Sequence, residues 1–170
     1  MQKRKLYLDC DGVILDTIKK SYEIIENQNL TTRNEIKFFY ENINWNELII
    51  KSGEIDHSIS KIKKLCNHFD IEILTHVYSE KEAKAKFDYF AKELPGINVI
   101  PVSKSIDKCD MVDPNGAILV DDFITNLEKW KKKGGIPIKF SDSGKKCDFT
   151  TITDLMQLLE IDFDNKVKVR

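Results

Sequence analysis

Two aspartates separated by one residue, Asp9 and Asp11, follow a short apolar run at residues 6–8. Such a run is typical of a strand buried on both faces, and residues i and i+2 of an extended chain point the same way. We therefore expect the two carboxylates to project together from the carboxyl end of the strand, with Gly12 permitting a sharp turn after them. Because like charges so close repel each other, the pair indicates a bound cation, although a plain acidic turn is the simpler alternative.

A second acidic pair, Asp121 and Asp122, follows the apolar run at residues 117–120. In parallel α/β sheets, ligands gather at the carboxyl ends of the strands. We therefore expect Asp121, with Asp122 beside it, to lie near Asp9 and Asp11, although Asp122 is also suited to cap the helix that follows. A hard cation with oxygen ligands fits this acidic set, and Mg²⁺ fits best.

Strands alternate with helices along most of the chain. The sequence pattern predicts strands at 6–8, 69–74, 97–102, 117–120 and 136–140, and helices at 17–27, 55–68, 80–93, 123–133 and 155–160. Ser79 and Glu82 are spaced as a capping box for the helix at 80–93. Pro137 favours an edge position for its strand, and Val167 and Val169 offer a further edge strand. The alternation is typical of a three-layer α/β fold with a parallel sheet between helices.

Residues 17–55 carry helical patterns of their own, with an N-cap at Thr31 or Thr32 and a break at Gly53. We predict a small helical insertion over the first turn, which leaves residues 1–16 and 56–170 as the core domain. The aromatic residues of the insertion are more typical of its own core than of a substrate platform. Trp45 is the strongest candidate among them for a substrate contact.

The composition is that of a soluble globular chain of 170 residues with a net charge of −1, which does not favour nucleic acid as an obligatory partner. Its four cysteines, Cys10, Cys66, Cys109 and Cys147, lie far apart and indicate reduced thiols rather than a metal or disulfide framework. The apolar run after the basic N-terminus is too short for a signal peptide, and no run has transmembrane length. We expect a cytoplasmic protein.

The string at residues 9–13, DCDGV, with Asp16 and Thr17 after it, resembles the first motif of the haloacid-dehalogenase-like (HAD) phosphohydrolases. The resemblance implies a Rossmann-like core with a small helical cap, a nucleophile at Asp9 and a general acid/base at Asp11. It also implies a Mg²⁺ ion held by Asp9, the main-chain carbonyl of Asp11, Asp121, and Asp122 directly or through water. The dehalogenase branch of the family lacks the second aspartate, so Asp11 indicates phosphoryl chemistry.

Two further elements of the family are assigned by position. Thr75, at the end of the strand at 69–74, resembles the second motif, whose hydroxyl donates to the phosphate. For the lysine that offsets charge on the nucleophile and the phosphate we choose Lys104, with Lys108 as the main rival. Lys81 and Lys84 stay open as well. His76 is more typical of a hydrogen-bonded structural histidine than of a substrate contact.

The segment from Asp121 through Asn126 and Trp130 resembles the fourth motif of the 5′-nucleotidase/deoxyribonucleotidase-like branch, although the insertion is shorter than in typical deoxyribonucleotidases. The sequence thus predicts a Mg²⁺-dependent phosphatase that hydrolyses a small phosphomonoester, with nucleotides among the candidates, through an aspartyl-phosphate. The alternatives are a phosphomutase, a nucleic-acid-end phosphatase, and a non-catalytic binding or regulatory module. The oligomeric state is not indicated.

Overall fold

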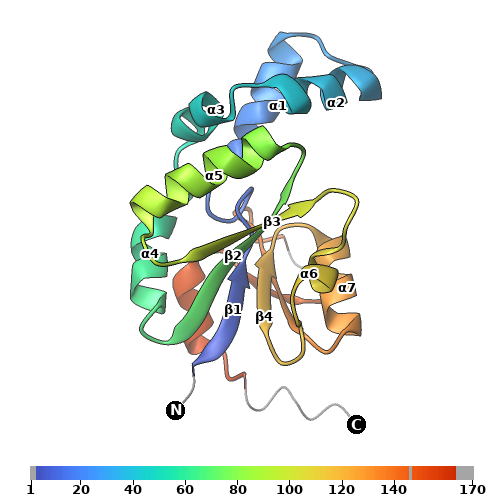
Figure 1. Ribbon diagram of the computed structural model, residues 1–170. Coiled ribbons are helices and arrows are strands. Elements are labelled where there is room, and N and C mark those ends of the chain that lie inside the picture. Colours follow the sequence, from blue (N-terminus) through green and yellow to red (C-terminus); the bar gives the residue numbers. More distant parts are fainter. Residues whose placement is uncertain (1–2, 146, 164–170) are drawn as a thin grey trace.

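The computed structural model describes residues 3–145 and 147–163, and its centre is a parallel sheet of six strands. The strands are β1 Arg4–Leu8, β2 Phe69–Val77, β3 Asn98–Ser103, β4 Ile118–Asp121, β5 Ile136–Phe140 and β6 Thr150–Ile152. Their order across the sheet is β3-β2-β1-β4-β5-β6, and every neighbouring pair is parallel. This confirms the predicted three-layer α/β fold (Figure 1).

Each face of the sheet buries its own apolar cluster, because successive side chains of a strand point to opposite faces. Leu6 and Leu8 pack on the side covered by α4 Ser58–Leu65, α5 Glu80–Glu93 and the 3₁₀ helix η1 Leu155–Glu160. Tyr7 packs on the other side, which α6 Lys108–Met111 and α7 Ile124–Lys132 cover. There its ring meets Trp130 edge-on at a centroid distance of 5.4 Å.

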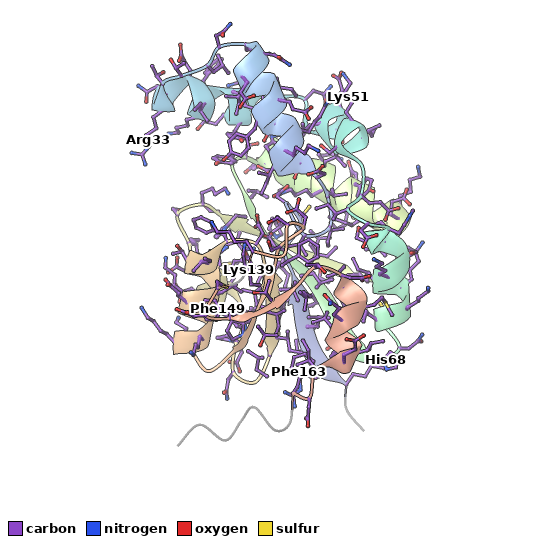
Figure 2. The ribbon with its side chains drawn as sticks, turned by 180° about the vertical axis from the view of Figure 1, so that it is seen from behind. Arg33, Lys51, His68, Lys139, Phe149 and Phe163 are labelled. Carbon is purple, nitrogen blue, oxygen red and sulfur yellow. The ribbon has the colours of Figure 1, made fainter. Side chains whose placement is uncertain are left out.

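Three helices, α1 Thr17–Asn27, α2 Arg33–Asn42 and α3 Trp45–Ser52, lie beyond the carboxyl ends of the strands, and we call them the cap helices (Figure 1). Thr32 and Glu35 form a complete capping box at the start of α2, and Gly53, with a φ of 71°, ends α3. Seen from behind, Arg33 and Lys51 of the cap helices lie at the opposite end of the molecule from His68 and Phe163 (Figure 2).

The pattern-based prediction is wrong in a few places. The helix predicted at 55–68 spans only Ser58–Leu65, and the last helix is a 3₁₀ helix. β6 was not predicted, and because β6 pairs with β5, the strand that contains Pro137 is not at the edge. The capping box at Ser79 is incomplete, because the Glu82 carboxylate accepts a hydrogen bond from the Tyr78 amide instead. Val167 and Val169 lie outside the described residues.

Within the described ranges, no helix combines the length and the hydrophobicity that crossing a membrane requires.

Candidate active site

The turn after β1 places Asp9 against the end of β4. The Asp9 amide donates to the Val120 carbonyl at 2.9 Å, which continues the β1–β4 pairing past the strand. Gly12 adopts a φ of 76°, and a Cβ there would lie 2.6 Å from the carboxylate of Asp122. Only glycine therefore lets the turn follow this path and lets Asp122 approach so closely.

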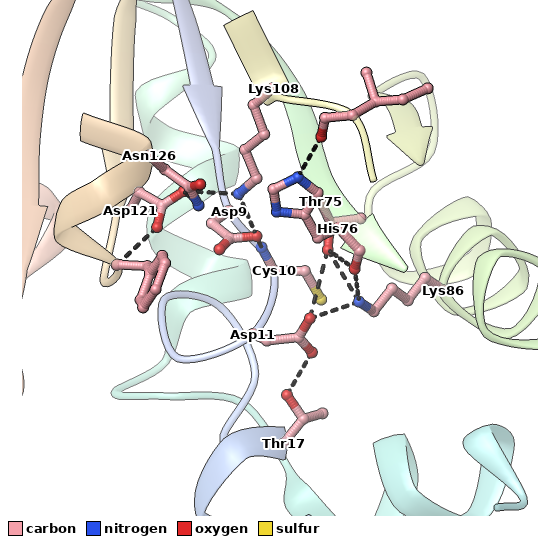
Figure 3. Close-up of polar contacts among 12 residues, drawn as sticks. Asp9, Cys10, Asp11, Thr17, Thr75, His76, Lys86, Lys108, Asp121 and Asn126 are labelled. Carbon is pink, nitrogen blue, oxygen red and sulfur yellow. Dashed lines mark hydrogen bonds and ion pairs between the residues drawn. The ribbon is translucent and has the colours of Figure 1, made fainter. Parts of the chain in front are cut away.

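Asp9, Asp121 and Asp122 each offer a carboxylate oxygen within 4.8 Å of the others, and we call these three residues the acidic cluster. Asp121 is fully buried. Its Oδ1 accepts the Phe123 amide at 2.8 Å and its Oδ2 accepts the Asn126 side-chain amide at 3.0 Å (Figure 3). The structure thus brings together the ends of β1 and β4, as expected from the sequence.

The lysine beside the acidic cluster is Lys108, so the choice of Lys104 for this position was wrong. Lys108 Nζ lies 2.7 Å from Asp121 Oδ2 and 2.9 Å from Asp9 Oδ1, between the two carboxylates (Figure 3). The reason is the path of the chain after β3, where Lys108 opens α6 and turns inward. Lys104 lies in the loop before it, and its Nζ is 4.6 Å from the ring centroid of Tyr78.

The Asp9 carboxylate has one held and one open oxygen. Oδ1 accepts the Cys10 amide at 2.7 Å and pairs with Lys108. Among residues 3–145 and 147–163, none donates a hydrogen bond to Oδ2, and no buried side-chain oxygen lacks a partner. Because Asp9 also lines a cavity, Oδ2 faces that cavity.

Burial dominates the electrostatics of the acidic cluster. It raises the pKa of Asp9 to about 7, although Lys108 opposes the shift. Burial, followed by the charge of Asp121, raises the pKa of Asp122 to about 6. Burial alone would lower the pKa of Lys108, but Asp121 and Asp9 raise it. The lysine therefore stays charged, and the cluster holds more carboxylates than it can neutralise.

A second buried lysine, Lys86 of α5, holds Asp11. Lys86 Nζ lies 2.6 Å from Asp11 Oδ2 and 2.7 Å from Glu82 Oε1. It also donates to Thr75 Oγ1 at 2.9 Å and to the His76 carbonyl at 3.1 Å (Figure 3). Burial alone would raise the pKa of Asp11, but Lys86 holds it below its usual range.

Neither Lys86 nor Glu82 was predicted from the sequence to belong to the site: among the lysines of this helix only Lys81 and Lys84 were considered, and Glu82 was assigned to a capping box. Lys84 instead pairs with Asp88 on the exposed side of α5. The signal was a charged pair four residues apart on the apolar side of a helix, since Glu82 and Lys86 are buried together with Ala85 and Phe90. Exposed pairs at this spacing are common on helices, whereas charged residues are rarely buried, so a buried ion pair indicates a specific structural or functional role.

Thr75 is fully buried, and its hydroxyl lies 3.5 Å from Asp11 Oδ2 as well as near Lys86. Its expected contact with a phosphate stays a prediction. His76 makes a structural hydrogen bond, as its ring Nε2 lies 2.9 Å from the Ile106 carbonyl. Trp45 is buried in the cap helices, and its indole N–H donates to the Tyr40 carbonyl at 3.0 Å.

A cavity of about 480 Å³ lies beside the carboxylates and is bounded by both the cap helices and the core. Asp9, Asp11 and Asp122 line it on the core side. Tyr22 and Phe123 also line it, with 57% and 59% of their surface exposed. The cavity is of the size that proteins use for small ligands.

The acidic cluster fits a hard divalent cation. Its donors are carboxylate oxygens, the ligands that Mg²⁺ prefers, and the cluster of three carboxylates contains more negative charge than Lys108 offsets. The Asp11 side chain points toward Lys86 and is not part of this cluster. A contact between the cation and the Asp11 main-chain carbonyl stays a prediction.

Sequence comparisons find no match, neither to a family model nor to a curated protein. Solved structures do match along nearly the whole chain. YfnB of Bacillus subtilis, which is described as a HAD-hydrolase and was solved bound to magnesium, is 15% identical with a TM-score of 0.65, over 94% of this chain and 98% of that one.

Two other matched structures have the same fold. A HAD-superfamily hydrolase of subfamily IA from Geobacter sulfurreducens is 12% identical with a TM-score of 0.63, over 93% of this chain and 95% of its own. The D,D-heptose 1,7-bisphosphate phosphatase of Burkholderia thailandensis is 15% identical with a TM-score of 0.57, over 94% of this chain and 100% of its own. The chain thus has the fold of HAD-superfamily hydrolases, among them a phosphatase. None of these three is described as a 5′-nucleotidase.

Proposed function

We propose that this protein is a Mg²⁺-dependent phosphatase that hydrolyses a small phosphomonoester through a phosphorylated Asp9. The observation that supports this most is the state of Asp9. One of its oxygens is held by Cys10 and Lys108, and the other faces a cavity next to the acidic cluster. A carboxylate with one fixed and one open oxygen is oriented for nucleophilic attack.

Asp9, Asp121 and Asp122 would hold the cation. When bound, Mg²⁺ would reduce the repulsion between the nucleophile and the phosphate and stabilise charge on the phosphate oxygens. Lys108 offsets part of the charge of Asp9 and fixes its Oδ1. Asp121 in turn fixes Lys108 and is held by the Phe123 amide, so the nucleophile rests on a preorganised hydrogen-bonded frame.

In the first step, Asp9 Oδ2 forms a bond to phosphorus while the bond from phosphorus to the leaving oxygen breaks. Asp11 gives its proton to that oxygen. Free Asp11 is ionised because of Lys86, and the negative charge of an incoming phosphate favours uptake of that proton. In the second step, Asp11 takes a proton from water, which attacks phosphorus and releases Asp9 and inorganic phosphate.

The test is the substitution Asp9→Asn, assayed with Mg²⁺ against a panel of phosphomonoesters. We expect turnover to be abolished while the circular dichroism spectrum and melting temperature stay close to those of the wild-type protein. Asp88→Asn, which removes an exposed carboxylate of α5, is the matched control and should keep full activity. Substantial phosphate release by the Asp9→Asn protein would contradict the mechanism.

We propose that the leaving group includes a planar ring, with nucleotides as the first candidates. The exposed rings of Tyr22 and Phe123 line the same cavity as Asp9, one from the cap helices and one from the core. Exposed aromatic faces stack favourably on planar groups. A nucleoside 5′-monophosphate should have a lower KM than ribose 5-phosphate, which has the same phosphate and no base, and Tyr22→Ala should reduce the difference.

A further inference from the structure

Tyr78, the first residue after β2, lies where three segments of the chain meet. Its ring is stacked on Tyr40 of α2, with centroids 4.6 Å apart and an angle of 5° between the planes. Its ring also holds the ammonium group of Lys104, whose Nζ is 4.6 Å from the centroid. One side chain therefore contacts both the cap helices and the loop at residues 104–107, which we call the lysine loop.

Tyr40 connects this stack to the other cap helices. Its hydroxyl lies 3.0 Å from Ser21 Oγ of α1, and its carbonyl accepts the Trp45 indole N–H at 3.0 Å. The rings of Tyr40 and Trp45 are also stacked, with an angle of 20°. Tyr40 of α2 therefore contacts both α1 and α3, and through it the Tyr78 ring is linked to all three cap helices.

The lysine loop connects the stack to the nucleophile. The loop leads directly into α6, whose first residue is Lys108, and Lys108 Nζ lies 2.9 Å from Asp9 Oδ1. The loop is also held from β2 by the His76 ring, which contacts the Ile106 carbonyl at 2.9 Å (Figure 3). The lysine loop is thus held at two points, by the His76 ring and by the Tyr78 ring. Of these two rings, the Tyr78 ring is the one that is stacked on Tyr40 of the cap helices.

We propose that Tyr78 is a positioning residue that couples the cap helices to the lysine loop, so that Lys108 is correctly placed at Asp9 only while the cap helices are docked. The proposal rests on the proposed function for its consequence in catalysis. The coupling runs through the ring, because the Tyr78 main chain is fixed separately by its amide, which donates to Glu82 at 2.7 Å. Truncation to alanine removes the ring contacts and keeps that hydrogen bond.

The experiment compares Tyr78→Ala, Tyr78→Phe and the wild-type protein by hydrogen exchange and by kinetics. In Tyr78→Ala we expect faster amide exchange in both α2 and the lysine loop. We also expect kcat to fall by about five- to tenfold, the factor that an aromatic pair of this kind corresponds to. Tyr78→Phe keeps the stacking face and should restore both properties. Phe38→Ala, which removes an exposed ring from α2, should leave the loop and kcat unchanged.

Lys104→Met separates the two ends of the coupling, because it should loosen the lysine loop and leave α2 protected. The proposal is overturned if Tyr78→Ala leaves exchange in the lysine loop unchanged, or if Tyr78→Phe is as impaired as Tyr78→Ala. The two proposals can fail separately. If the wild-type protein hydrolyses no phosphomonoester, but the lysine loop still exchanges faster in Tyr78→Ala, the proposed function is refuted and the coupling is supported.

Discussion

The site contains two buried lysines that each join two carboxylates, and the two arrangements differ in how fully the lysine is used. Lys86 contacts four acceptors: Asp11, Glu82, Thr75 Oγ1 and the His76 carbonyl. An ammonium group has three protons, so Lys86 has none left for a ligand. Lys108 contacts two acceptors among the described residues, on Asp9 and Asp121, and keeps one N–H uncommitted.

The charges around the two lysines differ as well, and they are more fully compensated around Lys86 than around Lys108. Around Lys86, burial and hydrogen bonds satisfy every partner, and the group holds the Asp11 side chain in one position. Around Lys108, Asp122 adds a further carboxylate that the lysine does not touch. The comparison teaches that Lys86 has all of its protons engaged and fixes Asp11 at the edge of the cavity, whereas the carboxylates around Lys108 outnumber it, as a site that binds a cation requires.

The largest effect on activity is expected from Lys108→Met. Loss of the ammonium leaves Asp9 and Asp121 without their shared partner and removes a fixed positive charge beside Asp9, the proposed nucleophile. We expect kcat to fall by about 10²–10³-fold, the range found when one preorganised charge-stabilising donor is removed. Steady-state phosphate release at saturating substrate measures this. A Lys104→Met protein, which loses a lysine of the same cavity, should lose much less.

Lys86→Met should affect stability first. The substitution leaves the buried Glu82 and the partly buried Asp11 without their shared cation, which costs about 3–5 kcal/mol of unfolding free energy. Urea denaturation followed by circular dichroism measures the loss. Adding Glu82→Gln removes one of the two stranded charges and should recover part of the stability. If Lys86→Met unfolds at the wild-type urea midpoint, the arrangement around Lys86 does not stabilise the fold.

The sequence predicts the parts of the site whose residues directly follow a recognisable strand, and it does not predict the parts that depend on the path of a loop. Asp9 and Asp11, like Asp121 and Asp122, are close in sequence and directly follow apolar strands, so the rule on strand ends places them together. Lys108 was only the second choice, because no pattern in the chain specifies where the loop after β3 turns inward.

Other misses have similar causes. Lys86 lies on a helix with several lysines, and only its burial with Glu82 distinguishes it from those on the surface. β6 is too short for periodicity to separate it from the start of a helix. The carboxylates of Asp9 and Asp11 were expected to project together, but the Asp11 carboxylate pairs with Lys86 and lies outside the acidic cluster, because a lysine that is distant in sequence reaches it from α5.

Addition of Mg²⁺ should stabilise the protein through the acidic cluster alone. At a concentration of about 100 times Kd, binding to the folded state adds about 2.7 kcal/mol to the unfolding free energy. The gain should shrink in Asp122→Asn, which removes one ligand oxygen of the cluster. Glu82→Gln removes a carboxylate from the Lys86 arrangement and should keep the full Mg²⁺ effect. An equal loss in both variants would show that the two arrangements do not differ in cation binding.

The smallest effect concerns His76, which touches both arrangements, since its carbonyl accepts from Lys86 and its ring contacts the loop that leads to Lys108. Burial, together with the charges of Lys108 and Lys104, lowers the pKa of His76 below its ordinary value of 6.5. The unfolded chain therefore takes up a proton at a higher pH than the folded protein. Stability should accordingly fall as the pH drops below about 6.5.

The carboxylates of Asp9 and Asp122 titrate in the same region, so the contribution of His76 is the difference between the wild-type protein and His76→Gln. Urea denaturation at intervals from about pH 7.5 to 5.5 should show the wild-type protein losing more stability than the variant over this range. A difference that stays constant with pH would mean that the ring is as easily protonated in the folded protein as in the unfolded chain. The contact with Ile106 would then hold the loop equally well in either charge state, because the Nε2 proton that it uses is present in both.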